Sequence, residues 1–273
     1  MAFIIGLAVG IIVGALGAGG GILAVPILVY LLHQDPHDAA AASLMIVGVT
    51  ALVALPGRWR AGDVRVKDGL IFGALSVIGS LLGGLLSRFV SSDVLMSLFA
   101  VLLVAVGLVM LRRARLTRKE ERLIAAGRED EIVRKATWAA AARDSHGLLL
   151  LIVSATLTGF LTGFFGVGGG FAVVPMLVLV MAFGMKQASG TSLLVMVIAS
   201  VAGLASRLGA DIHIDWPVIA LFAVGSSLGG VLGGPLTKRV PSSVLTLVFA
   251  LLLLGVAVAT GIQAIPALYA DLT

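Results

Sequence analysis

The sequence has no cysteine and few charged residues, with 12% charged side chains among 273 residues. The absence of cysteine excludes disulfides and thiolate metal sites. A soluble domain has about 25% charged and 45–50% apolar residues, whereas 59% of this chain is hydrophobic. Long uncharged runs such as 94–111 and 242–268 are typical of membrane spans and show no polar helical face. We therefore expect an integral membrane protein.

The net charge of +5 is the one feature that suggests a nucleic-acid partner. Most basic residues, however, lie in loops beside the apolar runs, where the preference of Lys and Arg for the cytoplasmic side explains them. We expect the lipid bilayer as a partner and no nucleic acid. The pattern predicts a multi-pass protein of the cell inner (plasma) membrane; a homodimer is possible.

One glycine-rich stretch occurs twice. The first copy runs from Gly14 to Pro26 and the second from Gly163 to Pro175, at an offset of 149 residues. The same offset pairs Ser43 with Ser192. These matches predict an all-α polytopic membrane protein with two homologous repeats of 4–5 transmembrane segments each, interrupted by Gly-rich helix breaks. The expected domains are a first repeat 1–111, a polar linker 112–146 and a second repeat 147–273.

The topology depends on whether each Gly-rich run separates two crossings or only kinks one. With five segments per half the repeats are inverted, and a cytoplasmic linker places 17 of the 19 basic residues inside. With four spans per half the repeats are parallel, and 15 of the 19 lie inside. The positive-inside rule favours the inverted arrangement, but two residues do not settle the question.

The glycine runs predict an anion site. Consecutive glycines adopt positive φ at little cost, so that successive N–H groups can point into one concavity, and the following helix N-terminus adds partial positive charge. The alternative is that the glycines only permit close helix packing, which better explains Gly79, Gly83, Gly225, Gly229 and Gly233. The candidate substrate-binding glycines are Gly17, Gly19, Gly20, Gly21, Gly166, Gly168, Gly169 and Gly170.

Hydroxyl and basic side chains at segment ends complete the candidate site. Ser43, Thr191 and Ser192 are candidate hydroxyl donors to an oxyanion, and helix N-caps are the alternative. Arg58 and Arg207 occupy matched positions and are candidate gating or anion-attracting residues, with snorkelling to headgroups as the alternative. The segment 33–38 contains metal-ligand side chains, but its counterpart in the second half has none, which favours a loop with an Asp-Pro turn.

These motifs resemble the sulfite exporter TauE/SafE (TSUP) family of membrane permeases over essentially the whole chain. The paired G-x2-G-x-GGG-x4-P stretches, the segment 188–194 and the basic linker carry the resemblance. It implies an inner-membrane permease for a small inorganic or organosulfur anion such as sulfite or sulfoacetate. The first half departs from the second at 40–43, where it offers fewer hydroxyls.

We expect a transporter and not an enzyme, with no cofactor and no resident metal. The alternatives are an anion channel, which would use the same donors without alternating access, and a divalent-metal permease based on segment 33–38. No apolar segment carries a titratable side chain well inside its run, as a proton relay would require. The expected energetics are therefore anion uniport, with proton coupling through His37 or His213 as the alternative.

Overall fold

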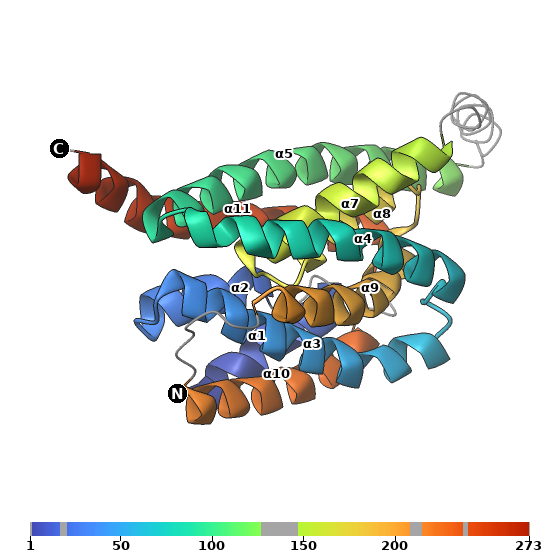
Figure 1. Ribbon diagram of the computed structural model, residues 1–273. Coiled ribbons are helices and arrows are strands. Elements are labelled where there is room, and N and C mark those ends of the chain that lie inside the picture. Colours follow the sequence, from blue (N-terminus) through green and yellow to red (C-terminus); the bar gives the residue numbers. More distant parts are fainter. Residues whose placement is uncertain (1, 17–20, 127–146, 208–214, 237–239, 273) are drawn as a thin grey trace.

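The computed structural model describes residues 2–16, 21–126, 147–207, 215–236 and 240–272, and these residues form helices and no strand (Figure 1). Six helices are long and apolar enough to cross a membrane, and four shorter apolar helices accompany them. The expected all-α polytopic architecture is confirmed. In chain order the elements are α1 (Ala2–Leu16), α2 (Gly21–Pro26), η1 (Ile27–Leu31), α3 (Pro36–Arg60), α4 (Val66–Leu86), η2 (Ser87–Phe89), α5 (Ser92–Ala125), α7 (Gly147–Phe165), α8 (Gly170–Leu179), α9 (Met185–Ala205), α10 (Trp216–Leu236) and α11 (Ser242–Leu272).

Helices that correspond at the sequence offset of about 149 run antiparallel to each other. In the α3–α9 pair, Leu44 lies against Gly203, whereas the loop residue Asp63 after α3 lies against Gly190. In the α5–α11 pair, Gly107 lies against Leu254, and Glu121 bonds to Ser243. As the residue numbers rise along one helix, the numbers of the residues that it contacts on its counterpart fall, so the two helices run in opposite directions. This is the geometry that the inverted arrangement predicts.

Glycines bring two further pairs, α1–α10 and α4–α7, into backbone contact, and both pairs are parallel. A methyl group placed on Gly6 would lie 2.5 Å from the carbonyl oxygen of Phe222, and one on Gly14 would lie 2.1 Å from that of Gly230. Such contacts are possible only without a Cβ atom. The packing interpretation is confirmed for the five glycines to which it was given, Gly79, Gly83, Gly225, Gly229 and Gly233.

The chain reverses direction at each Gly-rich run. In the first half, α1 and α3 are both parallel to α10, so α2 and η1 carry the chain back from the end of α1 to the start of α3. In the second half, a methyl group on Gly169 would lie 2.3 Å from Thr162 Oγ1, so α8 folds back along α7. Eleven residues of α2–η1 and ten of α8 span roughly 15–16 Å, about half the hydrocarbon core. Neither segment is therefore long enough to cross the hydrocarbon core alone.

The two ends of the bundle differ in charge. Arg60, Arg65, Lys67 and Lys186 lie at the end where α3 stops and α9 starts, and the basic last turns of α5 lie there too. At the opposite end, four carboxylates lie at or just before the starts of helices, namely Asp35, Asp38, Asp93 and Asp215. The basic end is the one expected to face the cytoplasm.

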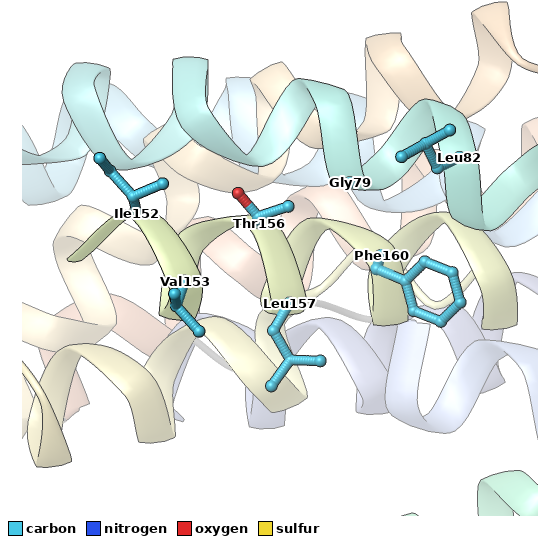
Figure 2. Close-up of a pocket in the computed structure, with 7 residues that line it drawn as sticks. All are labelled: Gly79, Leu82, Ile152, Val153, Thr156, Leu157 and Phe160. Carbon is cyan, nitrogen blue, oxygen red and sulfur yellow. The ribbon is translucent and has the colours of Figure 1, made fainter. Parts of the chain in front are cut away.

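A groove of about 460 Å³ lies on the flank of the bundle between α4 and α7 (Figure 2). Gly79 lets the helices approach, and Leu82, Val153, Leu157 and Phe160 form apolar walls. Thr156 supplies its one hydroxyl. An apolar groove with one hydroxyl offers little to an anion, so the candidate site lies at the helix breaks.

Candidate functional site

The second Gly-rich run forms a left-handed turn between α7 and α8. Gly166, Gly168 and Gly169 have φ angles of +67°, +66° and +78°, which side chains of L residues rarely allow. Gly170 begins α8. The expectation that consecutive glycines supply positive φ is therefore confirmed at three positions of this run, and they place backbone N–H groups at the start of an apolar helix.

Hydrogen bonds leave several of these N–H groups unused. The Gly166 N–H donates to the carbonyl oxygen of Thr162 at 2.9 Å and so ends α7. Within the described part of the chain, no carbonyl accepts a hydrogen bond from the N–H of Gly168, Gly169 or Gly170. Unsatisfied donors at a buried helix N-terminus attract negative charge, because the helix dipole adds to their partial charges.

The turn packs against α3 of the other half. A methyl group on Gly166 would lie 2.3 Å from the Cβ of Ala40, and one on Gly168 would lie 2.3 Å from a methyl carbon of Val47. Ser43 shares the helix face of Ala40 and Val47, because residues three or four apart lie on one face. Ser43 is fully buried, and its Oγ has no hydrogen-bond partner among the described residues. The turn therefore lies against the α3 segment 40–47, which includes the predicted Ser43.

The start of α2 meets the second break. A methyl group on Gly21, the first residue of α2, would lie 1.7 Å from the carbonyl oxygen of Val167 in the second break. Only glycine permits this approach. The candidates Gly17, Gly19 and Gly20 lie outside the described residues. Val47, which contacts the second break, is near the middle of α3, so the second break lies near half the height of that helix.

The hydroxyl candidates on α9 have different surroundings. The hydroxyl oxygen of Thr191 accepts a hydrogen bond from the Arg65 N–H at 3.0 Å and so fixes the α3–α4 loop. Ser192 Oγ donates to the Ser189 carbonyl oxygen at 2.8 Å. Ser189, which the sequence did not single out, is 2% exposed, and its Oγ has no partner among the described residues. In the sequence, the one feature that could have pointed to Ser189 is its place in the segment 188–194, which carries the family resemblance.

Arg58 and Arg207 hold the ends of the interrupted helices. Arg58 Nη2 donates to the carbonyl oxygens of Gly14 at 2.6 Å and Ala15 at 3.0 Å, and its Nη1 pairs with Asp63 at 3.2 Å. Arg207 donates to the carbonyl oxygen of Gly163 at 3.0 Å. Both side chains are buried. These bonds satisfy carbonyls that a helix C-terminus leaves unpaired, so snorkelling to lipid headgroups does not describe either residue.

The charge of Arg207 survives its burial. Desolvation by burial, together with the positive charge of Arg88, lowers the pKa of Arg207 to about 10. Because this pKa remains well above 7, the guanidinium stays protonated at neutral pH. A fixed positive charge therefore lies beside the end of α7, where it adds to the field that favours an anion at the break.

The segment 33–38 forms the turn that leads into α3. Asp35 caps α3 by accepting the His37 N–H at 2.8 Å, and Pro36 occupies the first helical position. His37 Nε2 lies 3.2 Å from the carbonyl oxygen of Val90. The described residues contain no group of three His, Cys, Asp or Glu side chains arranged to hold a metal ion. The Asp35 cap and Pro36 match the Asp-Pro turn.

Comparison with known proteins shows which family the chain resembles. The family model described as "Sulfite exporter TauE/SafE" matches residues 2–260. A probable membrane transporter protein of Xylella fastidiosa (strain 9a5c) is 33% identical over 92% of this chain and 90% of its own length. The probable membrane transporter protein YunE of Bacillus subtilis is 29% identical over 93% of this chain and 95% of its own length. The probable membrane transporter protein MJ0441 of Methanocaldococcus jannaschii is 25% identical over 87% of this chain and 85% of its own length.

No solved structure matches the chain significantly. The family match and the apolar helices agree on a multi-pass membrane transporter, and the relatives' names point to a transporter rather than an enzyme. The chain belongs to the sulfite exporter TauE/SafE family.

Proposed function

We propose that the protein transports a small oxyanion, with sulfite, sulfoacetate or a related organosulfur anion as the substrate class. The observation that supports the proposal is the second break: no carbonyl of the described residues accepts a hydrogen bond from Gly168, Gly169 or Gly170, and the α3 segment that contacts the break carries Ser43, which is fully buried and has no partner among the described residues. All four groups can donate hydrogen bonds to an anion. The family description supplies the sulfite class.

The site is built across the two halves. The second break supplies the backbone donors, and α3 of the first half supplies Ser43. We propose that the first break and Ser192 form the corresponding arrangement, because the offset of 149 relates them to the second break and Ser43. Repeats 1–111 and 147–273 would then be inverted about this site, with the linker 112–146 in the cytoplasm. Half-helix N-termini that point at an anionic substrate are a known design of secondary transporters.

The proposed energetics are uniport. In the described helices, ionisable side chains lie in the first or last turns or beyond the apolar run of α5, and no carboxylate or imidazole lies at mid-height to relay protons. An inside-negative potential drives an anion outward, and each elementary charge gains roughly 2.3 kcal/mol per 100 mV. That energy corresponds to a gradient of about fiftyfold.

The test is flux through the purified protein in proteoliposomes. Saturable uptake of radiolabelled sulfite with counterflow supports the carrier. An ohmic sulfite current without saturation indicates the anion channel, and uptake of Mn²⁺ or Zn²⁺ without anion flux indicates the metal permease. For the driving force, sulfite efflux is measured while a potassium–valinomycin potential and a pH gradient are varied separately. Efflux that follows the pH gradient and ignores the potential contradicts uniport.

A further inference from the structure

A second surface with both polar and apolar character lies between α5 and α11, at the basic end of the bundle. It is a groove of about 370 Å³, distinct from the helix breaks. The α5 residues of the groove are spaced i, i+3, i+4 and i+7, which places them on one helix face. The residues that line this α5–α11 groove are Leu111, Ala114, Arg115 and Arg118 of α5 and Ser243, Val244 and Leu247 of α11.

The groove carries positive charge. Arg115 and Arg118 are exposed, and no carboxylate of the described residues forms an ion pair with either. The acidic neighbours on α5 have other partners. Glu120 pairs with Arg113 at 3.7 Å, and Glu121 accepts hydrogen bonds from the N–H and hydroxyl of Ser243. Both guanidinium groups therefore remain available to an external anion.

The depth of the groove matches the edge of a bilayer. Leu111 is the last residue of the uncharged run 94–111, and Arg115 lies one turn further along α5, roughly 6 Å beyond it. Leu111 lies one turn deeper than Arg115, whereas Val244 and Leu247 of the antiparallel α11 line the groove at about the level of the two arginines. The groove thus has an anion-binding mouth at headgroup depth with apolar side chains beside and below it.

We propose that the α5–α11 groove binds one anionic phospholipid, with Arg115 and Arg118 on the phosphate and the apolar walls against an acyl chain. Arginine presents several N–H donors in a fixed planar arrangement that fits a phosphate oxygen pair. Basic pockets between transmembrane helices on the cytoplasmic side are typical sites for acidic headgroups. The apolar walls favour a lipid over free phosphate, because free phosphate would leave them exposed to water.

The test compares two variants that lose the same charge. The full chain is purified in detergent and titrated with dioctanoyl phosphatidylglycerol, and bound lipid is counted by native mass spectrometry. Each basic side chain near an anionic lipid contributes about fivefold to binding. We therefore expect Arg115→Gln/Arg118→Gln to weaken binding by roughly twentyfold to thirtyfold. The control Lys119→Gln/Arg122→Gln removes two charges from the same helix outside the groove and should bind within about threefold of the unmodified chain.

Three outcomes would overturn the proposal. An equal loss in both double variants would mean diffuse attraction by the basic helix. Equal binding of glycerol 3-phosphate or inorganic phosphate would mean an anion site without a lipid. Equal binding of zwitterionic dioctanoyl phosphatidylcholine would mean an apolar groove without charge recognition. A melting temperature measured on each variant without lipid separates loss of binding from loss of fold.

Discussion

Arg207 donates a hydrogen bond to the carbonyl oxygen of Gly163, forty-four residues earlier, at 3.0 Å. Arg58 makes the same bond to Gly14, also forty-four residues earlier, at 2.6 Å. Each carbonyl belongs to the last turn of a helix that ends at a Gly-rich break. In each half, therefore, an arginine in the last turn of the next long helix or just after it (Arg58 in α3, Arg207 after α9) caps the interrupted helix.

Replacing Arg58 should destabilise the protein. Arg58→Ala leaves the carbonyls of Gly14 and Ala15 and the carboxylate of Asp63 without this partner, and hydrogen bonds to charged groups contribute about 1.5–3 kcal/mol each. We expect a loss of about 2 kcal/mol or more, measured by thermal unfolding in detergent. The control Arg60→Ala removes an exposed arginine of the same turn. Equal melting temperatures for the two variants would show that the cap contributes nothing.

A side chain at Gly169 should impair transport. Gly169→Ala places a methyl group at φ +78° and 2.3 Å from Thr162 Oγ1, and the left-handed conformation alone costs about 1–2 kcal/mol. We expect sulfite flux to fall at least tenfold, and Gly169→Val to abolish it while the protein still inserts. Gly184→Ala is the matched control, because nothing lies within 4 Å of the added methyl and φ is −62°. Unchanged flux in well-inserted Gly169→Val would refute the backbone site.

Ser43 and Ser80 distinguish binding from stability. Ser43 Oγ has no hydrogen-bond partner in the described ranges of the chain, so Ser43→Ala should leave the melting temperature unchanged. It should raise the KM for sulfite about tenfold, since a hydrogen bond to a charged group is lost. Ser80 Oγ donates to the carbonyl oxygen of Ala199 at 3.2 Å. Ser80→Ala should therefore lower the melting temperature and leave KM unchanged. If Ser43→Ala has an unchanged KM, the hydroxyl does not contact the anion.

The orientation can be tested with single thiols, because the chain has no cysteine of its own. Ser91 and Ala125 are exposed at opposite ends of α5. With the linker in the cytoplasm, Ser91→Cys should react with a membrane-impermeant maleimide in intact cells, and Ala125→Cys should react only after the cells are opened. Labelling of Ala125→Cys alone in intact cells would reverse the topology.

Much of this architecture could be predicted from the sequence. The long uncharged runs predict the membrane helices. The repeated glycine triplets predict where these helices are interrupted, because three consecutive glycines disfavour a continuous helix. The roles of Arg58 and Arg207 could not be predicted, because a hydrogen bond across forty-four residues depends on how the helices pack. The contact between Thr191 and Arg65 likewise depends on helix packing, and the prediction that Thr191 donates to substrate stays a prediction. The sequence singled out Ser43 and its offset partner Ser192, but the complete burial of Ser43 is seen only in the fold.

Sulfite counterflow tests the central claim most directly. Proteoliposomes are loaded with unlabelled sulfite, diluted into a trace of radiolabelled sulfite, and compared for the unmodified protein, Ser43→Ala, Gly169→Ala and Gly184→Ala. We predict transient accumulation of label with the unmodified protein and Gly184→Ala, slower accumulation at low sulfite with Ser43→Ala, and almost none with Gly169→Ala. Label that enters no faster than in protein-free liposomes would contradict sulfite transport, and equal accumulation by all four proteins would contradict the site.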